Sequence, residues 1–144
     1  MNKKRALAGL AAVLMTACLS FAGDQNCSLA SVAGSFGFTT SGFVTTLNGT
    51  FPAAAAGRIV FDHNGNVSGT QTRVVLGSAL DESYSGTYTV NPDCTGSFTV
   101  VVQPDTRISS VNLVWTNNGK GASAVFTTPG FTLTATATRI SPGD

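Results

Sequence analysis

Few side chains in this sequence are placed where they could do acid–base, nucleophilic or metal chemistry. The one histidine, His63, directly follows Asp62 in the run Asp-His-Asn-Gly-Asn, which is typical of a tight turn. Adjacent side chains in such a turn diverge into solvent, and no Gly-x-Ser-x-Gly pattern presents a nucleophilic serine. The run also lacks the glycine at its sixth position and the carboxylate at its twelfth that a calcium loop needs. We therefore expect no catalytic residue, no metal site and no cofactor.

A more informative set of residues combines two charged side chains with three aromatic ones. Glu82 and Arg107 stand near the starts of two predicted strands, each in phase with apolar residues farther along its strand. If those faces point into a closed sheet, both charges lie at its mouth above the aromatic side chains, which is the usual form of a small-ligand pocket. The candidate pocket residues are Glu82, Tyr84, Tyr88, Arg107 and Trp115. The alternative is that the two charges are solvated strand ends and the aromatic side chains fill a core.

The stretch 83–102 predicts a β-hairpin. Tyrosine, glycine and valine alternate with serine and threonine as far as Val90, and a second alternating run follows the Asn-Pro-Asp-Cys-Thr-Gly segment. In that segment Pro92 fixes φ at a corner, and Gly96 is free to adopt φ > 0. Cys94 therefore lies at the bend of the hairpin.

The same alternation recurs along the chain and predicts eight strands. They cover residues 34–44, 57–62, 67–76, 80–90, 97–102, 107–116, 122–128 and 131–140. Residues 47–52 predict a loop, because Asn48-Gly49 is a strong turn pair, and the alanines at 53–56 lead into the second strand. No stretch has helical periodicity.

Short links between these strands favour an all-β fold. Nearly all of them carry Gly, Pro or Asn, so neighbouring strands are expected to pair in an antiparallel up-and-down meander. Closing the meander removes exposed edges, and glycines inside the strands suit the bends that closure needs. The prediction is an eight-stranded antiparallel β-barrel over residues 34–141 as one domain, with a β-sandwich as the alternative.

Residues 1–22 predict a signal peptide. A basic segment, Lys3–Arg5, precedes an uncharged apolar run, Ala6–Leu19, and Ser20-Phe21-Ala22 places small residues where signal peptidase cleaves. The run is shorter than the roughly 20 residues of a membrane-spanning helix. We expect export to the periplasm or beyond the cell, with no transmembrane span in the mature chain. A transmembrane barrel is disfavoured, because the strands with a clear two-faced pattern can put serine and threonine on the outside.

A second processing route is also open. Met15-Thr16-Ala17-Cys18 resembles the lipobox of bacterial lipoproteins, in which the cysteine becomes the lipidated first residue, although leucine is usual where Met15 stands. Lipidation at Cys18 would make the protein an outer-membrane lipoprotein.

The mature chain would carry little net charge. Removal of residues 1–22 leaves five basic residues against all seven acidic ones, a net charge of −2. No basic stripe remains to bind nucleic acid, so no nucleic-acid partner is expected. About 120 residues suffice for one domain with one core.

Cysteine usage fits an oxidising compartment. Cys27 and Cys94 remain once Cys18 is removed or lipidated, and a bridge between them would tie the N-terminal segment, residues 23–33, to the hairpin bend. The alternative is two free or intermolecular thiols.

Several of these segments together resemble small exported bacterial proteins of uncharacterised function. The matching segments are Gly57–Asp62, Asn64–Asn66, Ser68–Thr70, Tyr84–Val90 and Asp93–Gly96. The resemblance covers nearly the whole mature chain, and it implies export and a calycin-type or allene-oxide-cyclase-like barrel. The cyclase's catalytic residues have no counterpart here, so no functional residue carries over.

Three functions follow as hypotheses. The first is a non-enzymatic exported barrel that binds a small apolar ligand or a surface partner. The second is a structural or adhesive domain with a filled core and threonine-rich outer faces. The third is a cyclase- or isomerase-like enzyme, which rests on fold analogy alone.

Overall fold

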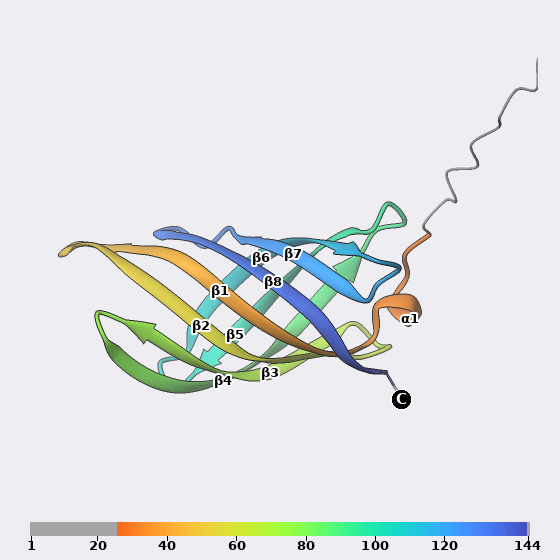
Figure 1. Ribbon diagram of the computed structural model, residues 1–144, viewed down its shortest axis with the longest axis horizontal. Coiled ribbons are helices and arrows are strands. Elements are labelled where there is room, and N and C mark those ends of the chain that lie inside the picture. The colour runs from red at the N-terminus through yellow and green to blue at the C-terminus, as the bar shows by residue number, and fades with distance from the viewer. Residues whose placement is uncertain (1–25, 144) are drawn as a thin grey trace, which may run out of the picture.

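Eight antiparallel strands form a closed barrel in the computed structural model, which describes residues 26–143 (Figure 1). A short helix, α1, precedes them. The elements are α1 (Leu29–Val32), β1 (Gly34–Thr46), β2 (Gly49–Phe61), β3 (Asn66–Val75), β4 (Ser78–Val90), β5 (Thr95–Gln103), β6 (Arg107–Thr116), β7 (Gly121–Phe126) and β8 (Phe131–Pro142).

Each strand pairs with its neighbours in the chain, and β8 pairs back onto β1. The predicted up-and-down barrel is therefore confirmed, and closure excludes the sandwich. The strands run alternately between two ends. At the closed end lie α1 and the turns at 62–65, 91–94 and 117–120, and at the open end lie the turns at 47–48, 76–77, 104–106 and 127–130.

The predicted loop over residues 47–52 is wrong beyond its first residues. The chain turns at Asn48, as Asn-Gly indicates, but β2 starts at Gly49 and runs unbroken through Pro52 and the alanines. Pro52 is tolerated because β3 ends at Val75, opposite Ala53, so this part of β2 pairs with β1 alone.

An aromatic cluster fills the closed end of the barrel. Phe61 is at its centre, and its ring centroid lies 4.9–6.1 Å from those of four other aromatic rings. Those rings belong to Phe36, Tyr88, Phe98 and Trp115. Val32 of α1, which is fully buried, packs against this cluster, so the helix closes this end beside the C-terminal residues (Figure 1).

The N-terminal segment is held in place by two kinds of bond. Cys27 forms a disulfide with Cys94, at the bend of the β4–β5 hairpin, and its amide donates to the carbonyl of Pro92 at 3.1 Å. Ser28 and Ser31 bond each other's backbone amides and so cap the helix reciprocally. The predicted bridge is present. The sequence pattern did not predict the helix, which is only four residues long.

Close approach of backbone and side chain explains why two strand positions are glycine. Gly69 lies opposite Tyr84 on the inner face, and a Cβ there would overlap the tyrosine hydroxyl and the carbonyl of Arg58. Likewise a Cβ at Gly96 would meet the ring of Trp115 at 2.5 Å. Both glycines let an aromatic side chain lie against the inner wall.

The expectations for the N-terminus, cleavage after Ala22 or lipidation at Cys18, lie outside the described residues. Within residues 26–143, no helix has the length and apolar character needed to cross a membrane.

Candidate ligand-binding site in the barrel lumen

The half of the barrel toward the open end encloses a cavity of about 290 Å³. Its space comes from small side chains, because strand alternation turns six alanines of β2, β7 and β8 inward. These are Ala53, Ala55, Ala122, Ala124, Ala135 and Ala137. Other inward side chains, among them Val100, Val102 and Leu133, make the wall predominantly apolar. The lumen is thus filled at one end and hollow at the other.

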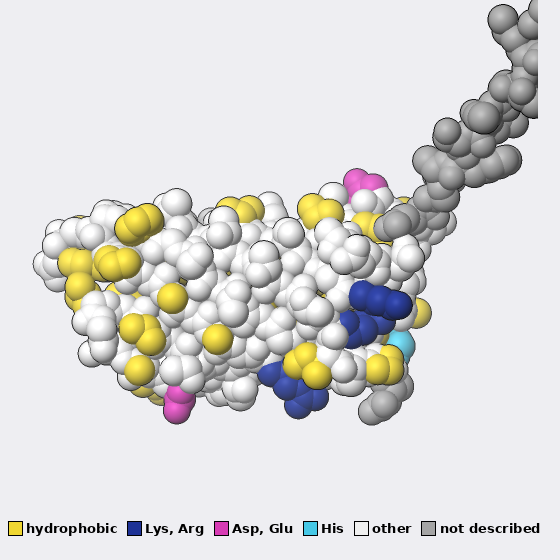
Figure 2. Space-filling view, viewed as in Figure 1, with side chains coloured by type: hydrophobic (Ala, Val, Ile, Leu, Met, Phe, Trp, Pro, Cys, Tyr) yellow, Lys and Arg dark blue, Asp and Glu magenta, His cyan; other side chains and the backbone are white. Residues whose placement is uncertain are grey.

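Two turns at the rim of the open end expose large apolar side chains. Leu47 and Leu76, in these turns, are 107% and 66% exposed. Figure 2 shows hydrophobic side chains at both ends of this face, whereas the Lys and Arg side chains visible in that view lie nearer α1.

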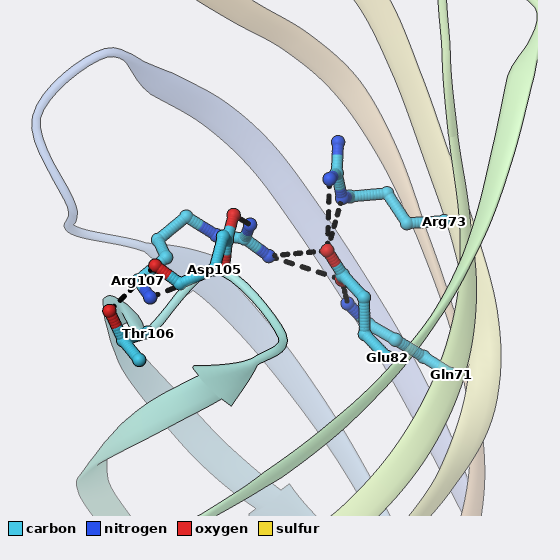
Figure 3. A network of polar contacts seen from close by, with 6 residues as sticks. All are labelled: Gln71, Arg73, Glu82, Asp105, Thr106 and Arg107. Carbon is cyan, nitrogen blue, oxygen red and sulfur yellow. Dashed lines mark hydrogen bonds and ion pairs between the residues drawn. The ribbon is translucent and has the colours of Figure 1, made fainter.

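A buried carboxylate stands at the mouth of this cavity. Glu82 is on the inner face of β4, and its side chain is 0% exposed. It accepts hydrogen bonds from Gln71 at 2.7 Å and from Nε of Arg73 at 2.9 Å, both on β3 (Figure 3). Nη2 of Arg107, on β6, adds two more at 3.0 and 3.1 Å. Both carboxylate oxygens are therefore bonded, as a buried charge requires.

A second carboxylate binds the same arginine from the rim. Asp105, in the β5–β6 turn, forms an ion pair through Oδ2 with Nη1 of Arg107, and its Oδ1 accepts the backbone amide of Arg107 at 3.2 Å. Its side chain is 47% exposed, whereas that of Arg107 is 21% exposed. The mouth thus contains two guanidinium groups and two carboxylates, one buried and one at the surface.

The hydroxyl groups of the two tyrosines both donate hydrogen bonds to backbone carbonyls. Tyr84 crosses Gly69 and donates its hydroxyl proton to the carbonyl of Arg58 at 3.1 Å, and Tyr88 donates to the carbonyl of Asp62. Burial raises the pKa of Tyr84 above the ordinary tyrosine range. Burial, and secondarily the charge of Asp62, raises the pKa of Tyr88 to about 12. Neither hydroxyl is arranged to exchange protons near neutral pH.

Of the five candidate pocket residues predicted from the sequence, three lie at the mouth or in the cavity wall and two lie in the aromatic cluster. Glu82 and Arg107 bond each other at the mouth, and Tyr84 lines the cavity. Tyr88 and Trp115 belong to the aromatic cluster below it and are not part of the cavity wall, because Phe61 and Phe98 cover them. Their role is to close the floor.

Two residues of the mouth, Gln71 and Arg73, were not singled out from the sequence. Both are an even number of residues from Val67, the first inward residue of β3. Strand alternation could therefore have predicted that their side chains point inward. Gln71 lies directly opposite Glu82 in the β3–β4 register, which follows from the turn at 76–77.

Asp62 and His63 lie in the turn that the sequence predicts, away from the cavity. Asp62 accepts the side-chain amide and backbone amide of Asn66 and the backbone amide of Asn64, each at 2.8 Å. These bonds, the Asn66 side chain first, hold the pKa of Asp62 below its usual value. Among residues 26–143, no hydrogen bond joins His63 to Asp62, and no three His, Cys, Asp or Glu side chains gather as metal ligands.

The arrangement can hold an apolar molecule of limited size beneath a polar mouth. The chain matches no family model, no curated protein and no solved structure in the comparisons made. The geometry of the lumen is therefore the basis on which function can be inferred.

Proposed function

We propose that this protein is an exported, non-enzymatic carrier that binds a small, mainly apolar molecule in the lumen of its barrel. The observation that carries the proposal is the apolar cavity of about 290 Å³ between the aromatic floor and the Glu82 network. Cavities of roughly 150 Å³ with apolar walls stay dry and bind benzene, so this one has space for a longer molecule.

The closed fold supports a role in holding a ligand. All the residues that line the cavity except Asp105 come from the eight hydrogen-bonded strands rather than from turns, so the cavity is largely pre-formed. A pre-formed site loses less conformational entropy when it binds. For a ligand of about ten heavy atoms we expect a dissociation constant on the order of 10 μM.

The hollow half of the lumen weighs against the structural domain with a filled core. Evenly filled small barrels stabilise themselves by packing, and each void reduces that packing. The six inward alanines on three strands reduce this packing, because larger side chains would fit in their place. Retention of a ligand would replace the missing contacts.

The test uses a neutral apolar dye, N-phenylnaphthylamine, whose fluorescence rises in apolar surroundings. Ala55 faces the cavity, and its neighbour Ala56 is exposed on the outer face of β2. We expect Ala55→Phe to fill the cavity and weaken dye binding at least about tenfold, a change of about 1.4 kcal/mol. Ala56→Phe makes the same change in composition outside the barrel and should leave the dissociation constant within about twofold.

Circular dichroism and urea unfolding of both variants establish that the barrel is intact. Equal dye affinity in the wild type and in a folded Ala55→Phe variant would place the dye elsewhere and refute the proposal. Failure of the wild type to bind this dye or any apolar probe of similar size would also refute it.

A further inference from the structure

Charge and hydrogen bonding at the mouth indicate the chemical class of the ligand. The inner part of the mouth contains two partly buried guanidinium groups, of Arg73 and Arg107, but only one carboxylate, that of the fully buried Glu82. The second counter-ion, Asp105, comes from an exposed side chain on a turn. Without Asp105, the two guanidinium groups and Glu82 therefore carry an excess of one positive charge beside an apolar cavity.

Hydrogen-bond donors at the mouth outnumber the acceptors that reach them. Nε of Arg107 is buried and has no acceptor among residues 26–143. Nε and Nη2 of Arg73 both contact the carboxylate of Glu82. Figure 3 shows the remaining terminal nitrogen of Arg73 turned away from that carboxylate. Guanidinium groups with free donors favour a planar anion with two oxygens, and a carboxylate has this geometry.

Asp105 is held loosely enough to give way to such a group. In its ion pair with Arg107, the Asp105 side chain is 47% exposed, and solvent-accessible ion pairs contribute little to stability. Its other oxygen bonds an amide of its own turn, so the turn does not depend on the ion pair. Asp105 also lines the cavity. Its carboxylate thus occupies a position at Arg107 that a ligand carboxylate could take.

We propose, building on the lumen-binding function above, that the ligand is an apolar monocarboxylate whose head group binds Arg73 and Arg107. The exposed Asp105 carboxylate is an internal competitor that the head group displaces. The apolar tail then runs down the lumen toward Tyr84. The direction follows from the fold, since the arginines stand at the mouth and the apolar wall lies behind them.

The experiment compares decanoate with decanol by calorimetry at pH 8, at which decanoate is ionised and decanol is neutral. Both have the same apolar chain, so the difference reports the head group. We expect the wild type to bind decanoate at least about threefold more tightly than decanol. In Asp105→Asn, which keeps the turn's acceptor oxygen and removes the competing charge, decanoate should bind about three- to tenfold more tightly still.

Two controls separate this effect from a general change of charge. Decanol affinity should stay within about twofold in Asp105→Asn. Asp81→Asn removes the same charge from the outer face of β4, where Asp81 bonds Thr72, and should change decanoate affinity by less than about twofold. Both variants alter exposed side chains, and urea unfolding checks that the barrel is intact.

The outcomes distinguish the two proposals. If decanol and decanoate bind equally well and Asp105→Asn changes neither, the carboxylate inference is overturned and lumen binding stands. An equal gain for decanoate in Asp105→Asn and Asp81→Asn would also overturn the inference, because net charge alone would then explain it. If neither molecule binds the wild type, both proposals fail.

Discussion

Glu82 and Arg107 bond each other across the end of β5, with Nη2 of the arginine 3.0 and 3.1 Å from the two carboxylate oxygens. Glu82 is on β4 and Arg107 on β6, and β5 ends at Gln103, opposite Ser83. Their side chains therefore meet inside the barrel just where the strand between them stops. This contact closes part of the mouth and fixes both charges above the cavity.

The first prediction concerns Glu82→Gln. The substitution conserves volume but leaves two guanidinium groups beside each other without their shared counter-ion, and it places an amide donor against their donors. We expect the free energy of unfolding to fall by about 2–3 kcal/mol. Urea denaturation followed by circular dichroism measures it.

Asp81→Asn is the matched control for this prediction. Asp81 adjoins Glu82 but is exposed on the outer face, where its carboxylate accepts a hydrogen bond from Thr72. Its loss should change the free energy of unfolding by no more than about 0.5 kcal/mol. Equal effects of the two substitutions would contradict a structural role for the mouth network.

The second prediction concerns Gly69→Ala. The added Cβ would overlap the Tyr84 hydroxyl and the carbonyl of Arg58, and the backbone carbonyl has little room to move. We expect a loss of about 2–4 kcal/mol in the free energy of unfolding. At Gly37 a Cβ would lie 3.3 Å from the terminal carbon of Ile140, which is exposed and flexible, so Gly37→Ala should cost less than about 1 kcal/mol. Thermal melts of the two variants, run side by side, compare their losses of stability.

The third prediction is that neither tyrosine ionises in the folded protein near pH 10. The pKa of Tyr88 is raised to about 12 and that of Tyr84 is raised further, while both are ordinary in the unfolded chain. A raised folded-state pKa contributes stability that is fully present below the unfolded pKa of about 10 and is lost as pH rises toward the folded value. Alkaline unfolding should therefore begin between about pH 10 and pH 12.

Phenolate absorbance during an alkaline titration tests this. It should rise together with the loss of the circular dichroism signal, and in urea it should rise around pH 10. A phenolate signal of two tyrosines near pH 10 in the folded protein would show that the hydroxyls are not buried as described.

The fourth prediction concerns the disulfide. The bridge joins residues 67 positions apart, and the chain-entropy account gives a stabilisation of about 4 kcal/mol for such a loop. Replacing both Cys27 and Cys94 by alanine should lower the melting temperature by about 10–15 °C. A reducing agent should lower the wild-type value by a similar amount and leave the double variant unchanged. A wild-type melting temperature that does not respond to reduction of the bridge would contradict the prediction.

Strand alternation was sufficient to predict the barrel and part of the mouth. A side-chain period of two fixes which face each residue occupies, so Glu82 and Arg107 could be placed inward without a structure. Their pairing with Arg73 and Gln71 could not, because it depends on the register of β3 against β4. Register follows from the turn at 76–77, whose Leu-Gly sequence has no distinctive turn signature.

The cavity itself was not visible in the sequence. An inward alanine such as Ala135 has the same pattern whether its neighbours fill the space or leave it open, since that depends on the radius of the barrel and on side chains from other strands. The three aromatic residues were correctly placed inside, but only the structure shows that Tyr88 and Trp115 join the cluster at the closed end while Tyr84 lines the cavity. The start of β2 was likewise predicted too late, because whether a strand can contain Pro52 depends on where β3 ends.

The most direct test of the central claim is to locate a bound apolar molecule by nuclear Overhauser effects to methyl groups. Neighbouring valines provide an internal control: Val100 and Val102 line the cavity, whereas Val101 between them is 41% exposed on the outer face. With decanol bound, we predict Overhauser effects from its chain to the methyl groups of Val100, Val102 and Leu133 and none to that of Val101. Effects to Val101 without effects to Val100 would place the molecule on the outer wall and contradict a ligand-binding lumen.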